Sequence, residues 1–310
     1  MKNIFKKNNK QKIALALGGG AALGIAHIGV LKYLEEIDLK PDIIAGTSMG
    51  SVIGGMYAAD LPLKKIEEVA ISFNNKAKVL SLLSFAFQKS GIISHEKIDK
   101  FFRSYIKNKR IEDCAIDFIA VTVDLIKGNI LYINKGDLVD ALHASISIPG
   151  VFNPFEANGS LLVDGGVREN LPLAPLQKYK PDIVIAVDVL KSNLKITEDN
   201  FCEIDSSQKY IHKSNLNLLE KISDGFKQKS IPKDDKNLPD MTTVGLQSLK
   251  LLIDENSINK ERIYKPDLLI NLDMNNYKLW EFWQAREFID LGYKKTKEII
   301  ENSNLKISKG

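Results

Sequence analysis

The chain has 310 residues, of which 44% are hydrophobic and 26% charged, a composition typical of a folded globular protein rather than a disordered one. Its net charge of +4 is much smaller than the basic excess that is typical of a nucleic-acid-binding protein. No run approaches the roughly 18 apolar residues that span a bilayer. We therefore expect no nucleic-acid partner and no membrane-spanning helix.

The first twelve residues hold five lysines and no acidic residue. We interpret residues 1–11 as a basic tail, and weak attraction to anionic lipid is its alternative role. The tail has no apolar run of the length that a signal peptide needs, so we expect a cytoplasmic protein, with peripheral contact at the inner membrane surface as the alternative. Cys114 and Cys202 show neither metal-site nor disulfide-framework spacing, and a bridge between them is left open.

Strand-like apolar runs and helix-like patterns alternate along most of the chain. In chain order we expect a strand at 13–17, a helix at 22–36, a strand at 42–45, a helix that follows Gly50 and runs through Ala59, a helix starting near Pro62, a helix capped by Ser94, strands at 117–124 and 129–134, a helix at 137–146, strands at 160–163, 182–189 and 267–272, and a helix at 279–302.

This alternation predicts an α/β protein with a mostly parallel sheet and helices on both faces. We expect one domain over residues 12–302, followed by a short tail at 303–310. Residues 191–241 are rich in Lys, Asp, Asn and Ser and lack apolar periodicity, so we interpret them as a polar excursion from this domain. The pattern does not indicate an oligomeric state.

Residues 79–87 are unusually apolar for a connection between helices. Packing in the core is the simpler interpretation. The alternative is a wall or flap of an acyl pocket that touches lipid, in which Phe85 and Phe87 would be the contacting side chains.

The central motif is Gly46-Thr47-Ser48-Met49-Gly50, which follows a predicted strand and precedes a predicted helix. This is the context of a nucleophile elbow, in which a strained serine needs small residues such as Gly46 and Gly50 beside it. The N-terminal amides of the next helix could then stabilise an oxyanion. The alternative is an ordinary turn in which Ser48 caps the helix.

Three glycines, Gly18, Gly19 and Gly20, follow the first predicted strand. Glycines there let backbone N–H groups approach a ligand, as an oxyanion cradle, as a dinucleotide-binding loop, or in a plain tight turn. The dinucleotide fingerprint fits poorly, because its last glycine falls on Leu23 and Gly24 comes one residue late. The phosphate-binding loop of nucleotide triphosphatases fails because no Lys-Ser/Thr pair follows the glycines.

Asp164-Gly165-Gly166 stands at the end of a predicted strand. If Asp164 reaches Ser48 it can act as general base without an imidazole, provided that the site is dry and preorganised. The alternative is a turn residue. None of the four histidines is well placed for a Ser-Asp-His triad, and we interpret all of them as structural: His27, His95, His143 and His212.

With these motifs in order, the chain resembles the patatin-like phospholipases. The segments that carry the resemblance are GGGAALGIAHIGVL (18–31), GTSMG (46–50), AVTVDLIKGNILYI (120–133), ASISIPGVF (144–152) and DGGVRENLP (164–172). The likeness is greatest to the compact bacterial members, over residues 12–190 and more weakly over 265–300.

The resemblance implies a three-layer α/β/α fold and lipid acyl hydrolysis by a Ser-Asp dyad. It makes Ser48 the nucleophile and Asp164 the base, and it assigns the oxyanion hole to the amides of Gly18, Gly19 and Gly20 with help from Met49. Leu23 stands where many members carry Arg or Lys, which weakens the expectation of an anionic phosphate head group and strengthens that of a neutral ester.

We therefore expect a serine esterase of the phospholipase A or lysophospholipase type, which acts on a lipid or fatty ester through an acyl-enzyme and needs no cofactor or metal. Two alternatives from other classes are a non-catalytic lipid-binding or regulatory protein on the same scaffold and, less favoured, a dinucleotide-binding oxidoreductase. Head group, chain length and positional preference are not determined by the residues.

Overall fold

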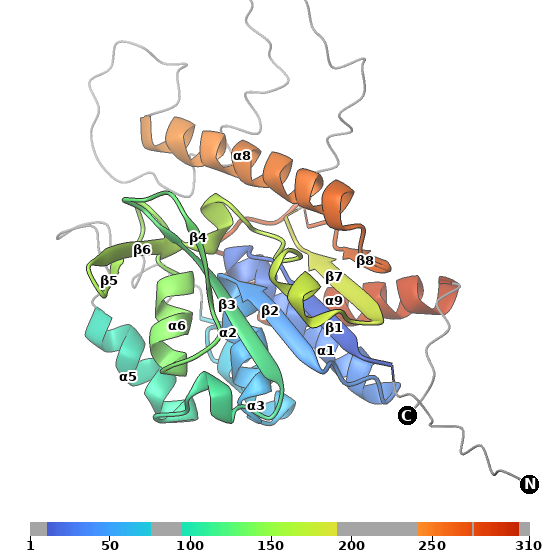
Figure 1. Cartoon of the computed structure of the whole chain (residues 1–310). Coiled ribbons are helices and arrows are strands. Elements are labelled where there is room, and N and C mark those ends of the chain that lie inside the picture. Colours follow the sequence, from blue (N-terminus) through green and yellow to red (C-terminus); the bar gives the residue numbers. More distant parts are fainter. Residues whose placement is uncertain (1–10, 76–94, 191–240, 275, 304–310) are drawn as a thin grey trace, which may run out of the picture.

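A computed structural model describes residues 11–75, 95–190, 241–274 and 276–303 of the chain (Figure 1). The apolar segment 79–87, with its flap hypothesis, and the polar excursion up to residue 240 lie outside the described residues, as do residues 1–10 and 304–310. In the described part, no helix is long and apolar enough to cross a bilayer.

The strands follow the apolar runs of the sequence. They are β1 (Ile13–Leu17), β2 (Ile43–Thr47), β3 (Asp117–Asp124), β4 (Ile130–Ile133), β5 (Phe155–Ala157), β6 (Ser160–Asp164), β7 (Ile183–Asp188) and β8 (Leu268–Asn271). The α-helices are α1 (Ala26–Glu36), α2 (Met49–Ala58), α3 (Leu63–Ile71), α5 (His95–Ile106), α6 (Leu138–Ser145), α8 (Met241–Tyr264) and α9 (Ala285–Asn302). Short 3₁₀ helices are η1 (Ala21–Ile25), η2 (Ile111–Asp113), η3 (Gly165–Val167), η4 (Pro175–Tyr179) and η6 (Phe282–Gln284).

The strands form one mixed sheet in the order β5-β6-β3-β2-β1-β7-β8, with β4 paired to β3 beside this path. Its centre is parallel, as expected: β1 lies between β2 and β7, and β2 and β7 are flanked by β3 and β8. The pairs β3–β4, β3–β6 and β5–β6 are antiparallel. The carboxyl ends of the parallel strands therefore meet at one edge, where ligands bind in open α/β sheets.

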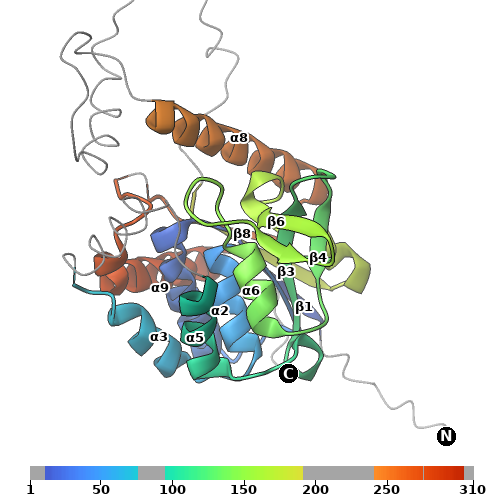
Figure 2. The ribbon, with the colours of Figure 1, turned by 90° about the vertical axis from the view of Figure 1, so that its left-hand side faces the viewer.

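Side chains of the central strands are buried on both faces, which identifies three layers. In β1 the large residues Ile13, Leu15 and Leu17 pack into the main core with the helices, whereas Ala14 and Ala16 face a second, smaller core. That smaller core is closed by Leu171, Leu173, Leu176 and the ring of Tyr264. Figure 2 shows α2, α5 and α6 together on one side of the strands. The predicted three-layer α/β/α fold is confirmed.

Helix α8 and strand β5 were not expected, and the last helix begins at Ala285 instead of residue 279, after the 3₁₀ helix η6. The apolar pattern of α8 is broken because Asp254 and Ser257 are buried while Leu251 and Leu252 are exposed. Figure 1 shows α8 along one end of the sheet, and it contacts η3 directly after β6.

Candidate active site

Ser48 occupies a sharp turn between β2 and α2. Its backbone has φ 53° and ψ −125°, a conformation that costs an L-residue about 1–3 kcal/mol and persists only where neighbours hold it. Its carbonyl accepts hydrogen bonds from Ser51 Oγ (2.6 Å) and Ser51 N (2.9 Å). Its hydroxyl makes no capping bond to α2, although it directly precedes that helix. The arrangement fits a nucleophile elbow better than a simple helix cap.

The glycines on either side are required by close backbone contacts. A Cβ on Gly46 would lie 2.5 Å from Ser51 Cα, and a Cβ on Gly50 would lie 2.2 Å from the carbonyl oxygen of Leu17. Neither distance is tolerable, and in each case the obstacle is backbone. The turn can therefore bring α2 against the ends of β1 and β2 only with glycine at both positions.

The register along β3 brings Asp164 beside Ser48. One side of β3 pairs with β4 from Ala120 to Val123. The opposite side pairs first with β2, ending at Thr47 opposite Val121, and then with β6, where Asp164 lies opposite Thr122. Thr47 and Asp164 thus pair with successive residues of β3. Because Thr47 directly precedes Ser48, this register brings Ser48 and Asp164 next to each other. The hydroxyl of Ser48 lies close enough to the carboxylate of Asp164 to lower the pKa of that carboxylate.

Asp164 is buried, with 5% of its surface exposed, and Ser48 is exposed to the same small extent. Burial disfavours the charged carboxylate and raises its pKa from 3.8 to about 6, against the opposing effects of the nearby Ser48 hydroxyl and of the hydrogen bond from the Gly166 amide. Oδ1 accepts from that amide at 2.7 Å, as a turn-forming aspartate does. Asp164 therefore combines the turn role with a place beside the serine, and it is ionised above about pH 6.

The last residue of α6, Ser145, and the segment that follows it hold the backbones of Ser48 and Asp164. Ser145 Oγ accepts from the Ser48 amide (3.0 Å) and donates to Val121 O (2.7 Å). Two residues later, the carbonyl of Ser147 accepts from the Asp164 amide at 2.9 Å. Sequence reasoning gave these serines no role. The only signal was their place in the segment 144–152, one of those that carry the family resemblance.

The glycine loop meets Ser48, but its three amides are not equivalent. Gly18 N donates to Val187 O (3.0 Å) and Gly19 N donates to Asn170 O (3.2 Å), so both are engaged within the protein. The amides of Gly20 and Met49 have no acceptor among the described residues. In this conformation the donors open to an oxyanion are therefore Gly20 and Met49, a smaller set than the sequence suggested. Gly165 continues from Asp164 into η3, and its carbonyl accepts from the amides of Arg168 and Glu169.

Two further side chains near the loop carry no positive charge at neutral pH. Leu23 is buried in the main core and supplies no charge at this position. His27 is fully buried, and desolvation lowers its pKa from 6.5 to about 4. Its Nε2 lies 2.8 Å from the carbonyl oxygen of Gly18, in agreement with the structural role expected for it.

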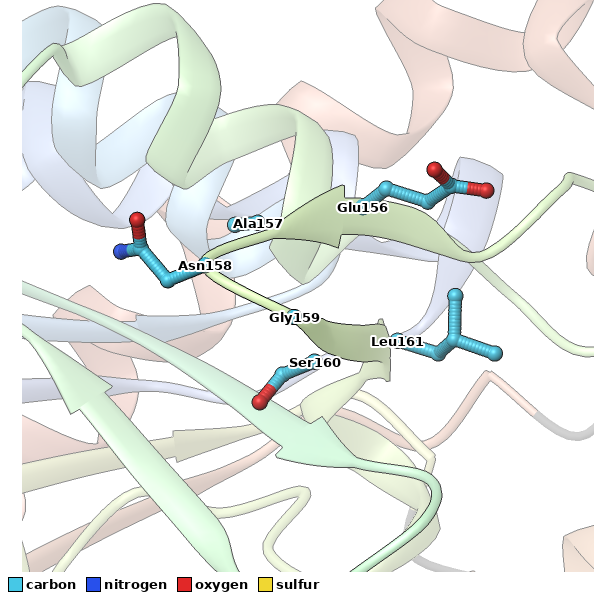
Figure 3. A pocket seen from close by; sticks show the side chains of 6 residues that line it. All are labelled: Glu156, Ala157, Asn158, Gly159, Ser160 and Leu161. Atoms are coloured by element: carbon cyan, nitrogen blue, oxygen red, sulfur yellow. The ribbon is translucent and has the colours of Figure 1, made fainter.

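A surface hollow lies farther along β6, on the hairpin that joins it to β5 (Figure 3). It is lined by residues 156–161 and contains neither Ser48 nor Asp164. Glu156 and Leu161 project from the same face of the hairpin, where they are a registered pair. This exposed hairpin surface is separate from the buried Ser48–Asp164 pair.

Comparison with known proteins agrees with the motifs. A family profile described as patatin-like phospholipase matches residues 15–176. An uncharacterized NTE family protein of Mycobacterium tuberculosis is 40% identical over 182 residues, which cover 59% of this chain and 50% of the relative. Lysophospholipase NTE1 of Coccidioides immitis is 35% identical over 184 residues, 58% of this chain and 12% of that protein. The chain thus spans about half the length of the mycobacterial relative and far less of the fungal one.

A solved structure with a similar arrangement is VipD from Legionella pneumophila. It is 13% identical in sequence, with a TM-score of 0.48, and the superposition covers 94% of this chain and 67% of VipD.

Proposed function

This chain belongs to the patatin-like phospholipase family, and we propose that it is a lipid acyl hydrolase in which Ser48 and Asp164 form a catalytic dyad. The observation that carries the proposal is the place of the Ser48 hydroxyl beside the buried Asp164 carboxylate, at the point where β2 and β6 meet along β3. Burial makes this carboxylate a stronger base than an ordinary aspartate while leaving it ionised at neutral pH.

In the proposed reaction, Ser48 Oγ attacks the ester carbonyl while Asp164 accepts the hydroxyl proton. The Gly20 and Met49 amides stabilise the oxyanion, and the start of α2 adds the positive end of its helix dipole. Asp164 returns the proton to the departing alkoxide, which leaves an acyl-enzyme on Ser48. Water activated by Asp164 then releases the fatty acid.

For the substrate we propose a fatty ester with one accessible acyl chain, such as a lysophospholipid or a neutral monoester. The fungal relative is named a lysophospholipase, which supports this class. The apolar Leu23 beside the loop supplies no cation for an anionic head group, so we expect little preference for anionic over neutral lipids.

The test is labelling by a fluorophosphonate probe followed by product analysis on lysophospholipids, diacyl phospholipids and neutral esters. Wild type should be labelled and should release fatty acid, and Ser48→Ala should do neither. Ser72→Ala is a matched control, because its hydroxyl bonds only the local carbonyl of Val69 at the end of α3. Hydrolysis by purified Ser48→Ala at the wild-type rate would refute the proposal. Absence of hydrolysis on every ester would favour a lipid-binding role.

A further inference from the structure

Asn170 lies between the glycine loop and the Asp164 loop and is almost fully buried, at 2% exposed. Its side-chain Nδ2 donates to Gly19 O at 3.3 Å, and its backbone carbonyl accepts from Gly19 N at 3.2 Å. One residue thus holds both polar groups of Gly19. The predictions from sequence assigned Asn170 no role.

The contacts fix two successive peptide groups of the loop. In the Gly18–Gly19 peptide, the carbonyl accepts from His27 and the N–H donates to Asn170. In the Gly19–Gly20 peptide, the carbonyl accepts from Asn170 Nδ2, and the N–H has no acceptor in the described part of the chain. A trans peptide directs its C=O and N–H in opposite directions. The side chain of Asn170 therefore determines the direction of the free Gly20 N–H.

The side chain of Asn170 lies close to both Gly19 and Gly166. A Cβ on Gly19 would lie 2.5 Å from Asn170 Oδ1 and 3.0 Å from Ser48 Cβ. A Cβ on Gly166 would lie 3.2 Å from the same Oδ1 and 3.1 Å from Asp164 Oδ1. Asn170 is thus packed against both loops that hold the dyad. An amide suits this place because it is neutral beside the Asp164 carboxylate and still provides a donor.

We propose that Asn170 is a positioning residue that aims the Gly20 N–H at the developing oxyanion. The inference rests on the proposed acyl hydrolase function and adds to it a residue that touches neither substrate nor nucleophile hydroxyl. Without the Nδ2 donor, the Gly19–Gly20 peptide can rotate, and the oxyanion then loses a directed hydrogen bond. The loss falls on the transition state, because a ground-state ester carbonyl needs this donor less.

The experiment compares Asn170→Ala and Asn170→Asp with wild type on the best ester from the substrate panel. Asn170→Asp keeps the shape of the side chain but replaces the donor with a carboxylate oxygen. At pH 8, kcat should fall roughly 10- to 100-fold in both variants while KM stays within about twofold. Affinity for an alkyl boronic acid, which forms a tetrahedral adduct on serine, should fall by the same factor as kcat/KM. Asn259→Ala, which removes an exposed amide bonded to Glu255, is the matched control and should change neither.

A merely structural role predicts different results. Activity near wild type in Asn170→Asp would show that only the shape matters and would overturn the inference. So would a loss of kcat with unchanged boronate affinity, or a loss confined to KM. All measurements are made below the unfolding temperature of each variant, because Asn170→Ala also leaves Gly19 O without its donor. An inactive wild type refutes the acyl hydrolase itself, whereas an active wild type with unaffected Asn170 variants refutes only the positioning role.

Discussion

Replacing Asp164 by Asn should abolish activity and stabilise the fold, by an amount that depends on pH. Burial raises the pKa of Asp164 from 3.8 to about 6, so the folded protein must hold a carboxylate that is more stable when protonated. At about 1.4 kcal/mol per pKa unit, the ionised form is disfavoured by about 3 kcal/mol. Because the folded-state pKa is raised, this contribution is absent below pH 3.8 and develops fully as pH rises through 6. Asparagine carries no charge at any pH.

We therefore expect Asp164→Asn to match wild type in stability near pH 3.5 and to exceed it by about 3 kcal/mol at pH 8. For a chain of this size that difference is roughly 5 °C in melting temperature. Thermal unfolding of both proteins from pH 3.5 to 8 measures it, and other titrating groups cancel in the comparison. Ser48→Ala is the control: it retains the carboxylate, so it should show no such gain at pH 8. A difference between Asp164→Asn and wild type that stays constant with pH would refute the desolvation argument.

Four other outcomes follow from the same contacts. The kcat/KM of wild type should rise through about pH 6 as Asp164 ionises, and a flat profile from pH 5 to 8 would contradict its role as base. Ser145→Ala leaves the Ser48 amide without its acceptor and should cost about 1–3 kcal/mol in denaturant unfolding, with a lower kcat; an unchanged midpoint would count against this clamp. Ala21→Gly should raise the free energy of unfolding by up to about 1 kcal/mol, because Ala21 has φ 47°; a lower free energy of unfolding would contradict strain at this residue. Gly292→Ala puts a Cβ 2.0 Å from a backbone oxygen of α1 and should cost about 3 kcal/mol, whereas the exposed Lys294→Ala should stay within about 0.5 kcal/mol.

Strands were predictable wherever an apolar run ended in small or polar residues. The run at 117–124 matches β3 residue for residue, and 13–17 matches β1. Helix α8 was not predictable in this way, because the side chains it buries include Asp254 and Ser257. Helical periodicity is read from apolar residues, so a helix that buries polar groups and exposes leucines gives a weak signal.

The residues of the candidate site also fall into two groups: those that a local motif predicts, and those that only the tertiary structure brings to the site. Ser48, Asp164 and the glycines that surround them stand in local motifs, where a tight turn dictates the residue type. Ser145 and Asn170 act across 97 and 151 residues, on Ser48 N and Gly19 O. No local pattern marks such partners, because a buried serine or asparagine looks the same whether it caps a helix or supports a site.

By itself the sequence determined the apolar strands, the strained serine turn and the order of the motifs, since these depend on residues adjacent in the chain. Only the tertiary structure decided that Asp164 meets Ser48 and that its pKa rises to about 6. Hydrogen bonding and desolvation depend on which distant segments exclude water from a group. Here those segments are β3, the end of α6 and the glycine loop, brought together by the register of the sheet.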